Sequence, residues 1–516
     1  MHPTDPCPGC PYAVAVSDVQ NDACRPSIPR CRVPQNSGLN PPAGFFLFTI
    51  PPTAVSLPFL PPAHSEALSV RRSYLLRALA FLVRHVVTIL RFRVAGYDRR
   101  FWRSYVCSLC PRAAAVSTLT FYLSEKRKVS FNWGGEKVCG LNIGGWLVLE
   151  PWITPSIFEQ FDASQGIVDE FTLNEKLGRD KALEVLKPHW DSWVGFEDFQ
   201  RIADAGFNLV RIPVGFWAYD TFGSAYSQGA APYIDAAIDW ARGTGLKVLI
   251  DLHGAPGSQN GYDNSGQRME TPQWLQGDTV NQTLSVIQQI ADKYAKTEYQ
   301  DVIAGIQLLN EPAGYELDVN AIKQFDRDGY AKVRSVSDTT VVIHDAFQNP
   351  SSYNGWMTPS DNNVQNVVLD HHEYQVFDNG MIKWSAAEHR QGVCNNRARW
   401  EGSDKWTIVG EWTGAMTDCA KWLNGYGRGA RYDNTFEGAG YVGDCGFASD
   451  LDSWDQQRKD DTRWYIETQM SAFEKIDGWI FWNFKTEQAP EWDWGKLSAA
   501  GVFPNPVTDR KFSAVC

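Results

Sequence analysis

The sequence has no uninterrupted apolar run of the length that a bilayer requires. Its most membrane-like stretch, residues 74–94, is broken by basic side chains at Arg77, Arg84, His85, Arg91 and Arg93. Because a charged side chain at the centre of a bilayer is costly, this stretch is predicted to be an amphipathic interfacial helix or a poor signal anchor. An ordinary signal peptide does not begin at Met1, since the first residues lack a basic start followed by an apolar core.

The signatures of several cofactor-dependent classes are also missing. No Gly-x-Gly-x-x-Gly follows the first predicted strand, which argues against a dinucleotide site. Residues 130–516 contain no phosphate loop, no metal-ligand cluster and no Ser/His/Asp order, so we expect neither a cofactor nor a metal. The Cys-x-x-Cys pairs at Cys7/Cys10 and Cys107/Cys110 lack histidine partners. A net charge of −12 argues against a nucleic-acid or anionic-membrane partner.

Composition divides the chain into two parts. Residues 1–65 hold 14 of the 28 prolines, and residues 71–128 hold thirteen Lys or Arg against two acidic residues. We therefore expect an N-terminal extension of low order over residues 1–129 and a folded domain over residues 130–516. Four of the eleven cysteines lie in the last quarter of the chain, and Asn281-Gln282-Thr283 is a glycosylation sequon. Both features fit disulfide formation and secretion.

Apolar strand-like runs alternate with helical patterns from about residue 131 onward. One helical pattern has apolar residues at 3.6-residue spacing over residues 280–294. Eight strands separated by helices predict a (β/α)₈ TIM barrel rather than an open doubly wound sheet. The domain exceeds the usual barrel length, so long loops are expected over the active face. The predicted strands are Val138–Trp146, Asn208–Val214, Leu246–Leu252, Val302–Leu309, Thr340–Ala346, Val367–Asp370, Thr407–Val409 and Gly478–Asn483.

Two glutamates, Glu311 and Glu411, each follow one of these apolar runs. In a barrel, residues at the C-terminal ends of strands meet at the mouth where substrates bind. Two carboxylates facing one site are what glycosidic bond cleavage requires, because one donates a proton and the other acts at the anomeric carbon. Their mutual repulsion is expected to raise the pKa of one of them, which would then serve as the acid.

Seven motifs in order resemble the fungal exo-1,3-β-glucanases of glycoside hydrolase family 5. The resemblance covers roughly residues 130–516 and implies a retaining mechanism on a TIM barrel, with Glu311 as acid/base and Glu411 as nucleophile. The motifs are Gly140–Trp152 (GLNIGGWLVLEPW), Asn208–Pro213 (NLVRIP), Asp251–Gly261 (DLHGAPGSQNG), Leu309–Pro312 (LNEP), His371–Phe377 (HHEYQVF), Gly410–Trp412 (GEW) and Phe481–Glu487 (FWNFKTE).

The same resemblance implies roles for ten further residues in binding the sugar. Asn310 would contact the sugar 2-hydroxyl, and Arg211 would lie behind the nucleophile and keep it ionised. His253, His372 and Tyr374 would bind sugar or orient the nucleophile, and the His-x-Tyr pattern selects His372 over His371. The non-reducing-end subsite would be formed by Glu150, Trp152 and Trp482. An aromatic pair at the entrance would be Tyr262 and Phe377, with Tyr262 in place of the expected phenylalanine.

The resemblance also implies disulfides Cys394–Cys516 and Cys419–Cys445, which leaves Cys139 as a buried thiol. We expect a secreted or cell-wall, monomeric enzyme that removes glucose from the non-reducing ends of β-1,3-glucan. Three alternatives stay open. The first is a related β-glucosidase acting on β-1,6-glucan or on aryl, flavonoid or steryl glucosides. The second is a transglycosylase that remodels glucan, and the third is a non-catalytic glucan-binding protein.

Overall fold

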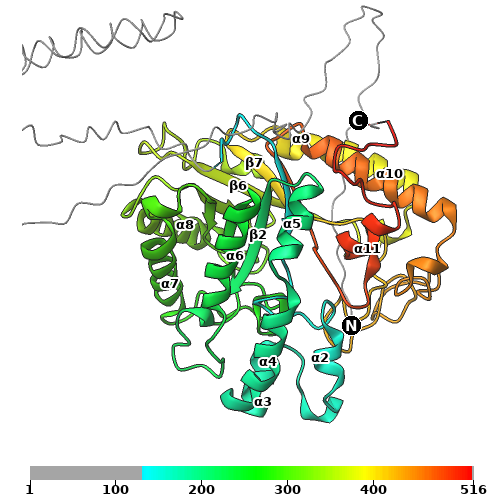
Figure 1. Ribbon diagram of the computed structural model, residues 1–516, viewed down its shortest axis with the longest axis horizontal. Helices are drawn as coiled ribbons and strands as arrows, with labels where there is room; N and C mark the ends of the chain where they lie inside the picture. The colour runs from blue at the N-terminus through cyan, green and yellow to red at the C-terminus, as the bar shows by residue number, and fades with distance from the viewer. Residues whose placement is uncertain (1–130, 514–515) are drawn as a thin grey trace, which may run out of the picture. The chain divides into compact units, whose positions relative to one another are not determined.

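The computed structural model describes residues 131–513 and 516 (Figure 1). Eight parallel strands close into one barrel in sequence order, which confirms the predicted TIM barrel and all eight predicted strands. The strands are β1 (Val138–Asn142), β2 (Leu209–Gly215), β3 (Lys247–Gly254), β4 (Ile303–Gln307), β5 (Val341–His344), β6 (Val367–Glu373), β7 (Trp406–Trp412) and β8 (Gly478–Phe481).

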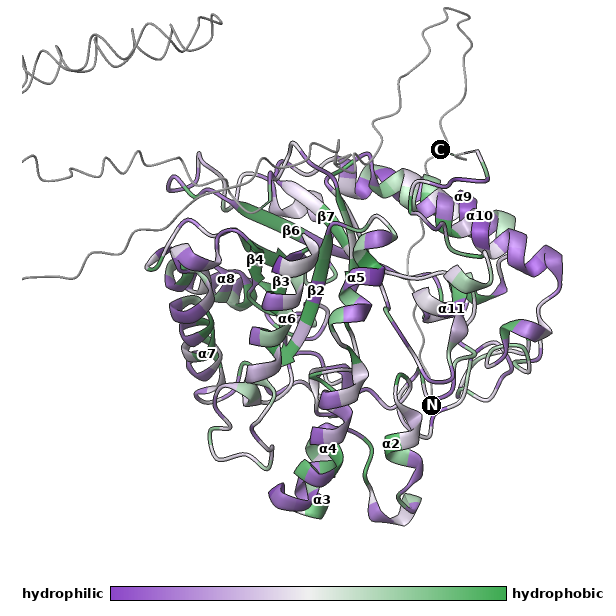
Figure 2. Cartoon of the chain, in the orientation of Figure 1, coloured by the Kyte–Doolittle hydropathy of each residue, from purple (hydrophilic) through white to green (hydrophobic). Residues whose placement is uncertain are grey.

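Helices surround the barrel and present polar side chains to solvent, while the strands are apolar (Figure 2). The predicted pattern over residues 280–294 is α7, whose buried face includes Leu284, Ile287 and Ala291. Between β5 and β6 the described chain forms a short 3₁₀ helix, Pro350–Tyr353, instead of an α-helix. The α-helices are α2 (Pro155–Glu159), α3 (Glu170–Leu177), α4 (Arg179–Trp193), α5 (Phe196–Asp204), α6 (Ala231–Thr244), α7 (Thr279–Tyr294), α8 (Val319–Arg334), α9 (Ala386–Glu401), α10 (Gln456–Phe473) and α11 (Trp494–Ala499).

The interior of the barrel consists of two layers with different chemistry. At the N-terminal end of the strands, one apolar residue from each strand forms a floor that Phe131 and Trp133 close from below. The Trp133 indole donates a hydrogen bond to the carbonyl of Ala304. Above this floor lies a buried polar layer made by Asn142, Arg211, Asp251, Gln307 and Asp370. The apolar layer supplies the packing, and the polar layer supports the residues at the mouth.

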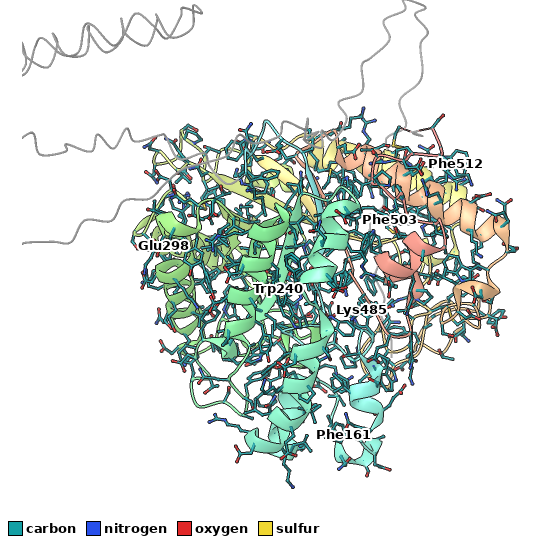
Figure 3. The ribbon with its side chains drawn as sticks, in the orientation of Figure 1. Phe161, Trp240, Glu298, Lys485, Phe503 and Phe512 are labelled. Atoms are coloured by element: carbon teal, nitrogen blue, oxygen red, sulfur yellow. A yellow bond between two sulfur atoms is a disulfide. The ribbon has the colours of Figure 1, made fainter. Side chains whose placement is uncertain are left out.

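Aromatic side chains fill the space between the strands and the outer helices. Phe503, from the C-terminal segment, lies with its ring 4.9 Å from that of Phe481 and 6.4 Å from that of Trp412 (Figure 3). Trp412 also packs edge-on against Phe473 of α10 and Trp479 of β8. Trp412 is therefore on the outer face of the barrel wall, although it follows directly after Glu411.

Two disulfides tie the C-terminal third together. Cys394 of α9 is bonded to Cys516, and Cys419 to Cys445 within the long loop between β7 and α10, which is the pairing implied by the resemblance. Cys139 of β1 is buried but does not carry a free thiol, so that expectation is wrong. None of the helices in residues 131–513 is both long enough and apolar enough to cross a bilayer. The expected extension over residues 1–129, with its basic stretch and its Cys-x-x-Cys pairs, lies outside the described residues.

Candidate active site

A pocket of about 580 Å³ opens at the C-terminal ends of the strands. Eight of the twelve residues predicted to bind or process substrate line it: Glu150, Trp152, Tyr262, Glu311, Tyr374, Phe377, Glu411 and Trp482. The other four lie directly beneath the lining and are almost completely buried: Arg211, His253, Asn310 and His372. The structure therefore brings all twelve into one region of the barrel.

Glu311 and Glu411 meet at a shared histidine. Nδ1 of His372 lies 2.7 Å from Oε1 of Glu311 and 3.5 Å from Oε2 of Glu411. These two carboxylate oxygens are thus at most about 6.2 Å apart, so both glutamates can flank one anomeric carbon, as the ~5–5.5 Å carboxyl separation of retaining glycosidases requires. Glu311 has a left-handed backbone with φ of 44°. Such strain costs about 1–3 kcal/mol and is found at functional positions.

Arg211 is the central side chain of the buried polar layer. Its Nη1 donates to Oε1 of Glu411 at 2.9 Å, and its Nη2 lies 3.1 Å from Oδ2 of Asp251. Further hydrogen bonds run from its guanidinium to the side-chain oxygens of Asn142, Asn310 and Gln307. A planar guanidinium with five donors can serve all these acceptors at once. Arg211 therefore fixes the orientation of Glu411 and balances its charge.

Glu411 faces the pocket because β7 contains one extra residue. Asp370 pairs with Ile408, His371 with Val409, and His372 with Glu411, so Gly410 has no partner in β6. Without this bulge, the two-residue period of a strand would place Glu411 on the face opposite to Ile408, which lies in the barrel floor. A Cβ atom at Gly410 would lie 2.1 Å from Oδ1 of Asp370, which accepts a hydrogen bond from the backbone N–H of Gly410. Only glycine fits this position.

The pKa values of the site are ordered differently from the expectation. Burial lowers the pKa of His372, but the charges of Glu411 and Asp370 and hydrogen bonds to Asp370 and Glu311 raise it well above its usual value. Burial raises the pKa of Glu311, but the hydrogen bond and charge of His372 outweigh burial and bring the pKa to about 2. Burial raises the pKa of Glu411 against the opposing charges of His372 and Arg211. Of the pair formed by His372 and Glu311, His372 therefore holds the proton that the two could share.

The remaining predicted residues hold the two glutamates or shape the walls around them. The hydroxyl of Tyr374 donates to Oε2 of Glu411 at 3.0 Å. Nδ1 of His253 lies 2.6 Å from Asp251, and its ring stacks on Trp482 with centroids 5.6 Å apart. Asn310 accepts a hydrogen bond from Arg211. His371 instead contacts Asp345 and Glu373, so it takes no part in the contact between the glutamates.

The rim of the pocket carries exposed aromatic rings. Tyr262 and Phe377 are 47% and 44% exposed, and the hydroxyl of Tyr262 lies 2.7 Å from that of Tyr315. Deeper in the pocket, the indole N–H of Trp152 donates to Oε2 of Glu150 at 2.9 Å. Burial and the charge of Asp263 raise the pKa of Glu150 well above its usual value.

Several pocket residues were not predicted from the sequence. Asn264, which donates to Oε2 of Glu311 at 3.0 Å, and Asp263 follow the Gln-Asn-Gly motif after β3. Arg428 and Arg431 come from the loop between β7 and α10. His344 ends β5, so its position at a strand end was the one available signal for it.

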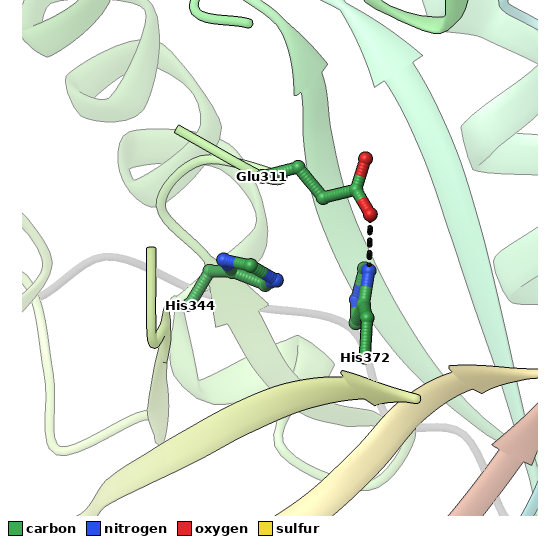
Figure 4. A group of neighbouring side chains, drawn as sticks. All are labelled: Glu311, His344 and His372. Atoms are coloured by element: carbon green, nitrogen blue, oxygen red, sulfur yellow. Dashed lines mark hydrogen bonds and ion pairs between the residues drawn. The ribbon is translucent and has the colours of Figure 1, made fainter. Parts of the chain in front are cut away.

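Glu311, His344 and His372 offer three possible metal-ligand atoms within 4.8 Å of one another (Figure 4). Their hydrogen bonds do not suit a cation, however. Both nitrogens of His372 face carboxylates, to which they donate. Nδ1 of His344 accepts the backbone N–H of Ala346, so the proton of this ring is on Nε2. Neither ring has a lone pair free to coordinate a metal, so we interpret the cluster as a proton-binding and hydrogen-bonding site.

Comparison with known proteins agrees with this geometry. The family model described as Cellulase (glycosyl hydrolase family 5) matches residues 187–429. A glucan 1,3-beta-glucosidase of Blumeria graminis is 47% identical over 80% of this chain and 97% of its own length. Glucan 1,3-beta-glucosidase 2 of Wickerhamomyces anomalus is 47% identical over 76% and 93%, respectively.

Among solved structures, the rutinosidase from Aspergillus niger is similar with a TM-score of 0.57. It is 18% identical, and the alignment covers 72% of this chain and 99% of that one, so this similarity concerns the fold alone. Sequence identity near one half, over nearly the whole length of the relatives, decides the family. This chain is a glycoside hydrolase that belongs to glycosyl hydrolase family 5, in the group of the fungal glucan 1,3-beta-glucosidases.

Proposed function

We propose that the protein is an exo-acting glucan 1,3-β-glucosidase that releases glucose from non-reducing chain ends with retention of configuration. The observation that carries the mechanism is the pair of carboxylate oxygens on Glu311 and Glu411, at most about 6.2 Å apart across His372. The substrate is inferred from the relatives named glucan 1,3-beta-glucosidase.

Glu411 acts as the nucleophile. Its carboxylate oxygen bonds to the anomeric carbon while the bond from that carbon to the leaving oxygen breaks, and the leaving oxygen takes a proton from Glu311. Water then attacks the same carbon, gives a proton to Glu311 and releases glucose from Glu411. Arg211 and Tyr374, which bond the two oxygens of Glu411, hold it in position and favour its ionised form.

The pKa order of the site is compatible with Glu311 as the acid. Moving one proton along the 2.7 Å hydrogen bond from Nδ1 of His372 to Oε1 of Glu311 gives a neutral imidazole and a protonated carboxyl. The number of protons in the pair does not change. The proton thus belongs to the coupled pair, and Glu311 delivers it when a leaving oxygen arrives.

Exo action is supported by the walls of the pocket. Loop residues 423–436, between β7 and α10, and residues 260–270, after β3, contribute to the lining of the pocket. The carboxyl group of Glu150 can hydrogen-bond distal sugar hydroxyls, and Trp482 offers a stacking face. A pocket that these loops close at one end would admit the terminal sugar of a chain and exclude the middle of one.

We further propose that the protein is secreted, works in the cell wall as a monomer, and is glycosylated at Asn281. Two disulfides support an oxidising compartment. Asn281 is exposed in the first turn of α7, although Thr283 of the sequon is buried there. A loss of mass from the secreted protein on treatment with an N-glycosidase, absent in Asn281→Gln, would support the modification.

The mechanism is tested by trapping the covalent intermediate. The protein is incubated with 2,4-dinitrophenyl 2-deoxy-2-fluoro-β-glucoside, which forms the glycosyl-enzyme quickly and releases it slowly. Peptide mapping by mass spectrometry should find the label on Glu411, and Glu411→Gln should neither take the label nor release glucose from laminarin. Glu311→Gln should still take the label, because dinitrophenolate leaves without a proton, but should lose about 10²–10⁴-fold on laminarin.

Glu373→Gln is the matched control, because Glu373 is a buried glutamate next to the site that contacts His371 and Asn396 instead. It should keep both the label and laminarin hydrolysis. Label on any residue other than Glu411, or normal laminarin hydrolysis by Glu411→Gln, would refute the proposed roles.

The exposed aromatic rim favours transglycosylation as a second candidate. Tyr262, Tyr315, Phe347 and Phe377 are exposed and line the mouth, where an acceptor sugar can stack. An acceptor hydroxyl would then replace water at the glycosyl-enzyme. Products longer than the starting material, formed from laminaribiose at high concentration, would identify this activity. Glucose as the sole product at every concentration would exclude it.

A further inference from the structure

His344 is a buried histidine next to the catalytic pair that the proposed mechanism does not use. It ends β5, is 1% exposed, and accepts the backbone N–H of Ala346 on Nδ1 at 3.0 Å. The ring proton therefore lies on Nε2, and this N–H has no hydrogen-bond partner in the described part of the chain. A buried donor without a partner costs about 1–3 kcal/mol, so a position of this kind calls for a functional explanation.

The unpartnered N–H faces the acid. The ring nitrogen of His344 farther from its backbone points toward the gap between Glu311 and His372 (Figure 4). Ligand atoms of these three residues lie within 4.8 Å of one another. The rings of His344 and His372 meet edge to face with centroids 4.5 Å apart. A short movement of the His344 ring, or a hydroxyl group between the two side chains, would therefore connect its N–H to the carboxyl of Glu311.

The surroundings keep the His344 ring neutral. Burial lowers its pKa to about 4, helped by the positive charge of His372 and opposed by Asp345, Asp370 and Glu311. Oδ1 of Asp345, at 3.7 Å from Nδ1, is the nearest of these acidic groups. A neutral imidazole donates a hydrogen bond without bringing a second positive charge beside His372.

We propose that His344 is a positioning residue for the acid/base, with its Nε2–H directed at Glu311 to favour the ionised form of that carboxyl. This inference rests on the proposed role of Glu311. When Glu311 has given its proton to the leaving oxygen, its carboxylate needs donors. Asn264 bonds Oε2, His372 bonds Oε1, and His344 completes the set. The electrostatic interaction with His253 also lowers the pKa of Glu311, whereas the interaction between Glu311 and Glu411 disfavours the ionised form of Glu411.

The sign of the pH effect follows from which form His344 stabilises. A donor that favours the carboxylate lowers the pKa of the acid, so its removal raises that pKa. The proton is then retained to higher pH, and the alkaline limb of the kcat/KM profile moves upward. Without this donor, the carboxylate that Glu311 becomes after giving up its proton is less stable, so proton donation is harder. The effect matters only when the leaving group needs a proton.

The test compares His344→Phe, which keeps a ring but removes the donor, with His344→Gln, whose amide can restore one. Two substrates are used, phenyl β-glucoside, which needs acid assistance, and 2,4-dinitrophenyl β-glucoside, which does not. We expect His344→Phe to lose about tenfold in kcat/KM on the phenyl substrate, as for one hydrogen bond to a charged group. On the dinitrophenyl substrate it should lose less than about threefold. Its alkaline limb should shift upward, and His344→Gln should recover part of both effects.

His389→Phe is the matched control. His389 of α9 is also buried, bonds Gln375 through Nδ1, leaves Nε2 without a partner in the described chain, and has its pKa lowered to about 4 by burial. It does not line the pocket. Equal losses on both substrates in His344→Phe, with the pH profile of His389→Phe, would reduce His344 to a packing role. Because both substrates are aryl glucosides, this result is independent of whether the natural substrate is a β-1,3-glucan.

Discussion

Replacing Arg211 by methionine tests whether the buried polar layer is held together by this one guanidinium. Methionine has similar length but no donor, so Glu411 and Asp251, at 4% and 0% exposure, would lose the guanidinium that contacts both of them. Breaking a buried ion pair from one side costs about 3–5 kcal/mol. For a barrel of this size, we therefore expect Tm to fall by about 4–6 °C. The pKa of Glu411 would rise further, so hydrolysis should fail even at temperatures where the variant is folded.

The measurement is thermal unfolding by calorimetry or circular dichroism, with Arg242→Met as the control. Arg242 pairs with Asp301 at the surface and its side chain is 32% exposed, so its loss should cost less than about 1 kcal/mol. Arg211→Lys should fall between the two, because a single ammonium keeps the charge but cannot reach five acceptors. A Tm for Arg211→Met within 2 °C of that of Arg242→Met would refute the reasoning.

Two further predictions concern the loop disulfide and a buried acid. Replacing Cys419 and Cys445 by serine should destabilise the fold by about 3.5 kcal/mol on a chain-entropy basis for a 26-residue separation and raise KM, because their loop lines the pocket. The matching change at Cys394 and Cys516 should lower Tm with KM unchanged. Burial raises the pKa of Glu491 to about 8, whereas in the unfolded chain it ionises at about pH 4.3. Between these two values only the unfolded chain is ionised at this position, so the wild type loses stability as pH rises, by up to ~1.4 kcal/mol per pH unit. In Glu491→Gln this loss should disappear, so its Tm relative to wild type should rise from pH 5 to pH 8; a constant difference would count against the assignment.

The fold was predictable because each strand is a continuous apolar run with a helix or loop after it. Buried parallel strands require such runs, and their number favours a closed barrel. The missing helix between β5 and β6 was not predictable, because the loop lengths alone leave room for one. The role of Phe131 and Trp133 in closing the floor also gives no periodic signal.

The site was predictable where its residues directly follow strands or fall in the resemblance motifs, as Glu311, Glu411 and His372 do. Asn264 and Arg431 come from loops, whose paths no periodicity determines. The pKa order could not be foreseen either. It depends on His372 lying within hydrogen-bond reach of one glutamate and beside the other, a distance that only the folded chain defines.

The unpaired glycine in β7 determines which side chain reaches the reacting carbon. A strand inside a closed ring cannot slide to absorb a lost residue, because both of its neighbours fix its register. A shift of β7 by one register position, with Gly410 paired to His372, would turn Glu411 toward the outer helices and bring the indole of Trp412 to the mouth. Surface loops can gain or lose residues freely during evolution, whereas a shift of one register position here would exchange a carboxylate for a bulky indole at the reacting carbon.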